Sequence, residues 1–399
     1  MNTHTHIVNS KKIYLDKNLQ ILFGVTIMSA VGIFSVSPAF PRIVRELQIS
    51  SRDVGLLIAI FTFPGILLMP VMGILADLFG RKKVLVPSLM VFGIAGGACF
   101  WVYDFTLLLV LRFFQGMGAA PLSSLNIAVI GDLYSGKRRT EALGYNQSIF
   151  SIGAASLTAL GGVLATIGWY YPFLLPLIAI PVGLFVAISL KSHEPRSAED
   201  VKEYIVSAWS TIRNRQILLI YAATIVTFVF MSGAYLTYFP LFLGFDFNVP
   251  PLLIGLIMSS MTVASAFSSS QIGKIVQVFS EKTIFEAGFI LYATALMIIP
   301  FIANTWLFFI PATIFGFVQG TNIPIIQTLL GNLSPAENRG IIMSLNGTAI
   351  RLGQTIGPVL MGTAYTLWGM HGVFYFGACL SIIMSGLIFI LVKQRDFTE

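Results

Sequence analysis

Long apolar stretches alternate with short polar ones along the whole chain. A helix needs about 20 mostly apolar residues to cross the hydrocarbon core of a bilayer, and twelve stretches of this kind can be read. The pattern therefore predicts an all-α membrane protein with twelve transmembrane helices. The predicted spans are 20–41, 53–75, 84–101, 105–130, 143–167, 172–190, 217–243, 252–272, 284–303, 306–330, 342–367 and 373–392.

The longest polar stretch, 191–216, divides the spans into two groups of six. Within it, Ser197 followed by Asp200 resembles the start of a capped helix, and apolar residues then recur at helical spacing. This predicts an amphipathic helix lying on the membrane surface, with a partly ordered tether as the alternative. The predicted divisions are a tail 1–19, a bundle 20–190, a linker 191–216, a second bundle 217–392 and a tail 393–399.

The second group of six spans repeats the first. Gly131-Asp132-Leu133 matches Gly331-Asn332-Leu333 at an offset of 200 residues, and the same offset pairs Asn146 with Asn346. Gln115-Gly116 matches Gln319-Gly320 at an offset of 204. Many secondary transporters are built from two such repeats with the substrate site between them. We therefore predict two pseudo-symmetric six-helix bundles.

Composition and charge placement support a membrane protein of defined orientation. Hydrophobic residues make up 56% of the chain and charged residues 10%, whereas soluble domains carry about 25% charged residues. Of the 24 Lys and Arg residues, 19 fall in alternate loops and 3 in the intervening loops. This positive-inside pattern predicts a plasma-membrane protein with both termini in the cytoplasm. The placement of the basic residues therefore explains the net charge of +7, and we expect no nucleic-acid partner. Tryptophans at predicted outer helix ends are Trp101, Trp169, Trp306 and Trp368.

Several function classes are disfavoured by what the sequence lacks. It has no Gly-x4-Gly-Lys-Ser/Thr loop for ATP, and its four histidines are scattered over tails and loops. We expect no enzyme activity, no cofactor and no metal site. A channel or receptor would not explain the duplicated halves. Nothing in the sequence requires an oligomer, so we expect a monomer.

The loop after the second span carries a distinctive motif, Gly73-Ile-Leu-Ala-Asp77-Leu-Phe-Gly80-Arg81-Lys82-Lys83. Gly73 would allow close approach of helices, Gly80 would permit a tight turn, and the basic residues would anchor the loop at the membrane surface. This motif resembles the loop signature of the major facilitator superfamily, and the resemblance covers the whole chain. It implies a charge network of Asp77, Arg81 and Asp132 that stabilises the outward-facing state.

The fourth span reads Leu111-Arg112-Phe-Phe-Gln115-Gly116. It resembles the arginine motif of the drug–proton antiporter branch of that family, which implies a proton-coupling or cavity role for Arg112 with Gln115. A structural hydrogen bond to backbone carbonyls is the alternative. The fifth-span antiporter motif is altered, because Leu157-Thr158 replaces Gly-Pro, although the repeat keeps Gly357-Pro358 as a helix bend.

Polar residues inside other spans are candidates for a substrate cavity, because such residues usually face the bundle interior. Hydrogen bonding between helices is the alternative. A bend at Pro38 would expose Ser35 and Ser37 in the first span. The cavity candidates are Asn146, Tyr235, Gln319, Asn322, Asn346, Arg351 and Gln354.

The resemblance implies a secondary active transporter that exports drug-like or amphipathic small molecules in exchange for protons. However, none of the 17 acidic residues falls at the middle of a predicted span, and many proton-coupled transporters use a buried carboxylate there. A cavity with arginines and no acid favours neutral or anionic solutes. A facilitator or importer of a metabolite, such as a sugar or organic acid, therefore remains the alternative.

Overall fold

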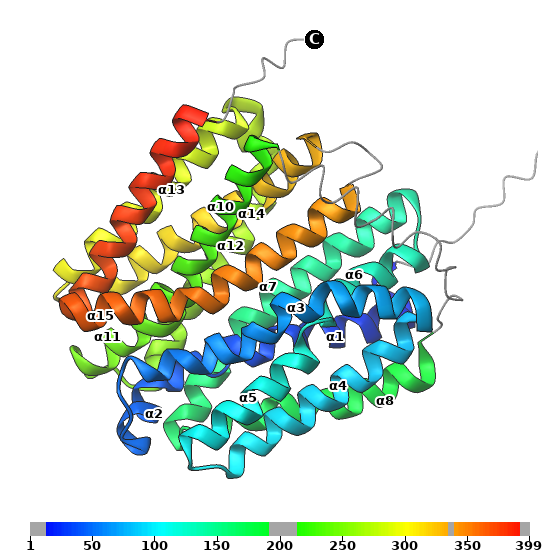
Figure 1. The fold of residues 1–399 in the computed structure, drawn as a ribbon, viewed down its shortest axis with the longest axis horizontal. Helices are drawn as coiled ribbons and strands as arrows, with labels where there is room; N and C mark the ends of the chain where they lie inside the picture. The colour runs from blue at the N-terminus through cyan, green and yellow to red at the C-terminus, as the bar shows by residue number, and fades with distance from the viewer. Residues whose placement is uncertain (1–12, 191–213, 334–338, 392–399) are drawn as a thin grey trace, which may run out of the picture.

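The computed structural model describes residues 13–190, 214–333 and 339–391, which we call the N-terminal half (13–190) and the C-terminal half (214–391). Nearly all of these residues are helical (Figure 1). The amphipathic helix expected in the linker lies outside the described residues, as do most of both predicted tails. The predicted domain boundaries therefore stay predictions.

The N-terminal half contains six helical segments, several of them interrupted. The first is α1 followed by a 3-10 turn at Ser37–Ala39 and by α2, so the predicted bend at Pro38 coincides with a break in the α-helix. The fourth is divided at Pro121 into α5 and α6. The bounds are α1 Lys17–Phe34, α2 Phe40–Leu47, α3 Leu56–Phe79, α4 Arg81–Ala98, α5 Phe105–Ala119, α6 Leu122–Leu133, α7 Gly136–Ile167 and α8 Ala179–Ser189, the last preceded by a 3-10 helix at Tyr171–Ile178.

The C-terminal half follows the same plan. Its first helix contains a π-helical segment, Phe230–Tyr238, between α10 and α11. Pro358 lies inside α15, which continues through it. The bounds are α10 Arg215–Val229, α11 Phe239–Phe245, α12 Pro251–Val278, α13 Glu281–Ile298, α14 Phe309–Leu333 and α15 Arg339–Leu391.

Eleven helical segments of the described chain are long and apolar enough to cross a membrane, and one of them accounts for two crossings. The segment Ile342–Ile390 has 49 residues and would extend roughly 70 Å as one straight helix, over twice the hydrocarbon thickness. It is broken at Gly369, whose φ is 70°, and Figure 1 shows α15 reversing direction there. The prediction of twelve spans is therefore confirmed.

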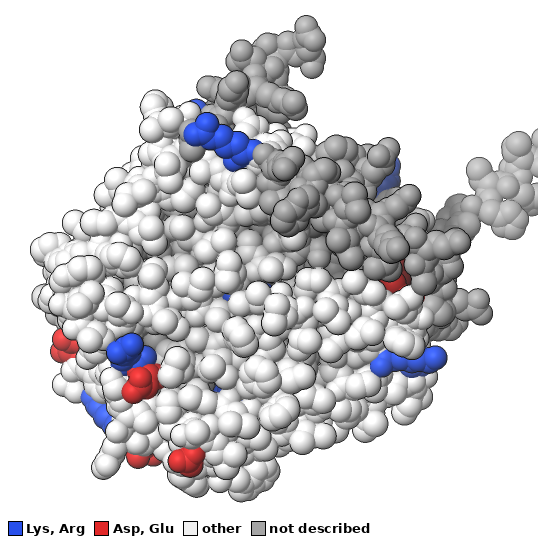
Figure 2. Space-filling view, in the orientation of Figure 1, with Lys and Arg blue, Asp and Glu red and all other residues white. Residues whose placement is uncertain are grey.

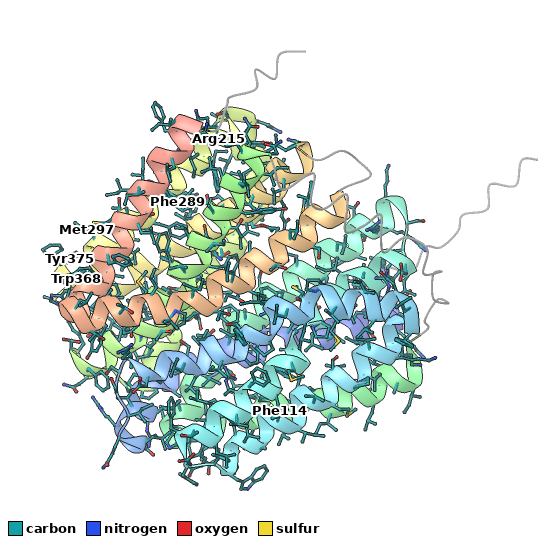
Figure 3. All side chains as sticks on the ribbon, viewed as in Figure 1. Phe114, Arg215, Phe289, Met297, Trp368 and Tyr375 are labelled. Atoms are coloured by element: carbon teal, nitrogen blue, oxygen red, sulfur yellow. The ribbon has the colours of Figure 1, made fainter. Side chains whose placement is uncertain are left out.

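The molecule has two chemically different ends. We call the end that carries Arg81–Lys83 and Lys137–Arg139 the basic end, and the other the opposite end. Trp368 lies at the turn of α15 at the opposite end, far from Arg215 at the start of α10 (Figure 3). Between the two ends, the visible surface is almost free of charged side chains (Figure 2), as a lipid-facing surface must be. Trp101, Trp306 and Trp368 are exposed, whereas Trp169 is buried among Tyr103, Tyr170 and Phe173.

Close helix contacts reveal the internal repeat. A methyl group on Gly116 of α5 would lie 2.0 Å from the carbonyl oxygen of Phe61, and one on Gly316 of α14 would lie 2.0 Å from that of Met261. Gly316 lies 200 residues after Gly116, and Met261 lies 200 residues after Phe61, so the second contact repeats the first. A methyl group on Gly320 would lie 2.1 Å from the carbonyl oxygen of Ser265, and this contact is related to that of Gly116 by the offset of 204. Both offsets read from the sequence therefore relate close contacts between corresponding helices.

The two halves touch at the opposite end. Ser37 donates a hydrogen bond to the carbonyl oxygen of Leu236, and Arg45 donates one of 2.8 Å to that of Gly244. Every residue from 30 to 41 and from 227 to 244 is buried, so these stretches of the first and seventh spans are enclosed on all sides. The structure is thus closed between the halves at the opposite end.

Candidate functional site

A charge cluster joins three helices at the basic end of the N-terminal half. Arg81 Nε lies 2.7 Å from Asp132 Oδ2, and Arg81 Nη2 lies 3.7 Å from Asp77 Oδ1. The turn that positions Arg81 depends on Gly80, whose φ of 97° is a conformation that favours glycine. The expectation for Gly73 is not met, because a methyl group there would have no neighbour within 4 Å. The predicted network of Asp77, Arg81 and Asp132 does come together.

This cluster supports a charge-exchange prediction. We expect Arg81→Asp and Asp132→Arg each to lower transport severalfold, and the double variant to recover much of it, because the ion pair would be re-formed in reverse. Stability should change by only about 0–1 kcal/mol, since partly exposed pairs contribute little. Transport by purified single and double variants in liposomes measures this. Additive losses in the double variant would contradict it, and Asp77→Asn, whose carboxylate is 62% exposed, should have the smaller effect.

Arg112 lies fully buried inside the N-terminal half. Its Nε donates to the carbonyl oxygen of Leu57 at 3.0 Å, and its Nη1 donates to Gln115 Oε1 at 2.8 Å. The guanidinium carbon stands 4.4 Å from the centre of the Phe61 ring, a cation–π distance. Within the described chain, Arg112 Nη2 and Gln115 Nε2 have no hydrogen-bond partner. The predicted pair therefore forms one unit that binds α5 to α3.

Asn146 and Asn346, paired by the repeat, occupy equivalent positions inside their own halves. Thr26 and Asn126 both donate to Asn146 Oδ1, the amide of Asn126 at 3.2 Å, and Thr224 donates to Asn346 Oδ1 at 3.1 Å. Both asparagines are buried. In this conformation they join helices of one half, as the helix–helix alternative expects.

Three other cavity candidates also lie within the C-terminal half. The Tyr235 hydroxyl donates to the carbonyl oxygen of Met258 at 3.0 Å. Gln319 Oε1 accepts a hydrogen bond of 2.6 Å from the Tyr292 hydroxyl. Asn322 is fully buried beside Gly288 and has no hydrogen-bond partner among the described residues. Asn322 is therefore the one of the three whose side-chain amide makes no hydrogen bond within the described structure.

Arg351 and Gln354 stand apart, because they lie where the two halves meet. Arg351 Nη1 donates to Gln354 Oε1 at 3.2 Å, and its stem packs on α3, where a methyl group on Gly65 would lie 3.0 Å from Arg351 Cδ. One turn further along α15, the hydroxyls of Thr355 and Thr62 are 2.9 Å apart.

Both Ser35 and Ser37, expected to face a cavity, are fully buried.

Thr62, Gly65 and Thr355 were not predicted as site residues. Their signals in the sequence are weak, since a threonine in an apolar span usually bonds its own helix. The structure places them with Arg351 in a contact between α3 and α15, which run side by side in Figure 1. We call this set, Thr62, Gly65, Arg351, Gln354 and Thr355, the central contact. Because α3 also carries Leu57 and Phe61, one helix connects Arg112 to the central contact.

Known proteins resemble this chain over nearly its full length. It is 22% identical to the quinolone resistance protein NorA of Staphylococcus aureus, covering 96% of this chain and 97% of that one. It is 26% identical to multidrug resistance protein 2 of Bacillus subtilis, covering 94% and 95%, and 23% identical to the class B tetracycline resistance protein of Escherichia coli, covering 96% and 98%.

Solved structures share the fold. A variant of the nucleoside transporter NupG matches with a TM-score of 0.82 at 11% identity, covering 96% of this chain and 100% of that one. The human organic anion transporter MFSD10 matches with a TM-score of 0.66 at 16% identity, covering 93% and 98%. The sequence profile of the Major Facilitator Superfamily matches residues 22–250 and again 230–398. With both halves matched, the chain belongs to the major facilitator superfamily and is a secondary transporter, not an enzyme.

Proposed function

We propose that this transporter exports amphipathic, drug-like small molecules in exchange for protons by alternating access. The observation that carries the proposal is the central contact, where the partly buried Arg351 lies between two halves that are closed against each other at one end. A rocking motion of the halves would part α3 from α15 and change the surroundings of Arg351. The resistance proteins that resemble the chain at full length support export as the direction.

The charges at the central contact favour neutral or anionic cargo. Neither Arg351 nor Arg112 has a carboxylate within 4 Å among the described residues. A cation without an anionic partner in a low-dielectric region attracts carboxylate or phenolate oxygens strongly. We therefore assign cargo contact to Arg351 and Gln354, with Asn322 as a further polar group on the C-terminal side.

The charge cluster of Asp77, Arg81 and Asp132 would control which state is populated. The described conformation is closed at the opposite end. In it the cluster makes its described contacts within the N-terminal half, and the Asp77 carboxylate is 62% exposed. A partner from the C-terminal half could bind that carboxylate when the basic end closes, and it would shift the equilibrium by its differential affinity for the two states. In this proposal the basic end faces the cytoplasm and the chain works as a monomer.

Transport into liposomes under an imposed pH gradient tests the proposal. The purified protein is reconstituted, and a panel of neutral, anionic and dicationic fluorescent amphiphiles is offered. We expect gradient-dependent accumulation of the neutral and anionic compounds that collapses with a protonophore. We also expect Arg351→Gln to weaken transport of the anions more than that of the neutral compounds.

Two other outcomes would change the proposed mechanism or contradict the proposed cargo. Equilibration that ignores the gradient would indicate facilitated diffusion of the same cargo. Preferential transport of the dication would contradict the assignment of Arg351. Arg42→Ala is the matched control, because Arg42 is a partly exposed arginine paired with Glu46 at 2.6 Å, away from the central contact.

A further inference from the structure

A cleft of about 630 Å³ opens at the opposite end of the molecule. Its size falls within the range of small-molecule sites. Charged side chains of both signs gather at this end, where α2, α11 and the turn of α15 lie in Figure 1 (Figure 2). Residues that line the cleft include Ser50, Arg52, Phe245, Asp246, Tyr365 and Met370. This cleft is separate from the central contact, and nothing assigned above uses it.

The cleft holds one cation and one anion that are not paired. Within the described parts of the chain, neither Arg52 nor Asp246 lies within 4 Å of an opposite charge. Partial burial raises the pKa of the Asp246 carboxyl above its ordinary value, and His371 opposes that rise. The carboxylate has therefore lost part of its hydration without gaining a salt bridge. The two charges come from different halves, so a ligand that bridges them would bridge the halves.

A buried tyrosine lies beside Arg52. The Tyr238 side chain is fully buried, and its hydroxyl has no hydrogen-bond partner in the described structure. A methyl group on Gly362 would lie 3.0 Å from the Tyr238 hydroxyl and 3.3 Å from Arg52 Cγ, so both groups border the same spot. The Tyr238 ring also packs at 5.6 Å against the ring of Tyr365, which lines the cleft. Tyr238 thus lies behind the wall of the cleft and supports Arg52 and Tyr365 from the protein interior.

The walls of the cleft are held together by contacts between the halves. Arg45 of α2 donates to the carbonyl oxygen of Gly244 at 2.8 Å and stands 5.1 Å from the centre of the Phe245 ring. On the neighbouring helix pair, α7 and α12 approach so closely that a methyl group on Gly162 would lie 2.5 Å from the Pro251 carbonyl oxygen. The cleft thus has this shape only while the opposite end is closed.

We propose that this cleft binds a small zwitterion with an apolar or aromatic body, and that its occupancy stabilises the conformation closed at the opposite end. The carboxylate of the ligand pairs with Arg52, and its ammonium group pairs with Asp246. Its apolar body packs on Phe245, Tyr365 and Met370. A ligand that binds one conformation better than the other shifts the equilibrium toward it, so this ligand slows transport.

Binding of the dipeptide Phe-Phe to the purified full-length protein tests the site. Phe-Phe has a free amine, a free carboxylate and two rings, and N-acetyl-Phe-Phe amide has the same rings without either charge. We expect saturable binding of radiolabelled Phe-Phe, and binding weakened about tenfold or more by Arg52→Ala and by Asp246→Asn, because charge-assisted hydrogen bonds are the stronger ones. Arg42→Ala, at the same end but outside the cleft, should bind normally.

Two results would overturn the site. One is no binding at millimolar Phe-Phe, and the other is equal binding of the uncapped and capped dipeptides or of all variants. These results leave cargo transport untouched, so failure of this site and failure of the proposed export are distinguishable.

A separate variant tests whether Phe-Phe binding depends on closure of the opposite end. Gly162→Leu separates α7 from α12 without altering any lining residue, and we expect at least about a tenfold loss of Phe-Phe binding. If that variant elutes as an aggregate, Arg45→Ala takes its place, because it removes the Gly244 contact without a clash. We expect it to bind Phe-Phe about threefold more weakly. Unchanged affinity in the well-folded variant would refute the coupling.

Discussion

Replacing Arg112 with alanine should reduce transport about tenfold or more, which corresponds to ~1.4 kcal/mol of lost stabilisation. The substitution leaves the buried Gln115 Oε1 without its donor and removes the hydrogen bond to the carbonyl oxygen of Leu57. An orphaned buried acceptor costs roughly 1–3 kcal/mol. Because Leu57 and Phe61 belong to α3, losing the guanidinium also loosens the helix that carries half of the central contact.

Arg112→Lys tests whether the positive charge of Arg112 or the shape of its guanidinium group matters for transport. A lysine keeps the positive charge but cannot reproduce the fixed fork that reaches both acceptors at once. We expect Arg112→Lys to fall between the native protein and Arg112→Ala, in both transport rate and thermal stability in detergent. Transport measured per mole of monodisperse protein is the readout, with Arg42→Ala as the control. Full activity in Arg112→Ala would show that the buried arginine serves no role in transport.

Gly116→Ala should destabilise the protein by about 1–3 kcal/mol, the usual range for overpacking a filled contact. The added methyl group would stand 2.0 Å from the carbonyl oxygen of Phe61. A backbone atom cannot turn away as a side chain can, so α5 and α3 must move apart. The equivalent substitution, Gly316→Ala, meets the carbonyl oxygen of Met261 at the same 2.0 Å and should have a similar effect in the other half.

Gly153→Ala provides the matched control. Its methyl group would lie 3.4 Å from Ile27 Cγ1, an ordinary contact, and alanine favours a helix over glycine by about 0.5–1 kcal/mol. We expect this variant to be as stable as the native protein or slightly more stable. Thermal aggregation in detergent compares all three, and equal behaviour of Gly116→Ala and Gly153→Ala would contradict the close approach.

The sequence alone determined the features that depend on local chemistry. A helix in a bilayer must satisfy its own backbone and cover itself with apolar side chains, so length and hydropathy were enough to place twelve spans. The break of the first span at Pro38 and the turn at Gly80 depend on one residue each. The cluster of Asp77, Arg81 and Asp132 could be anticipated because the family resemblance implied it.

Only the tertiary structure decided which helices each polar side chain joins. Asn146 and Arg351 look alike in the sequence, each a polar residue in an apolar span, yet one joins helices of its own half and the other lies between the halves. Hydropathy has little to distinguish one side of a helix from another when lipid and protein interior are equally apolar. The direction in which a side chain points is therefore set by packing between distant segments, and no local pattern carries it.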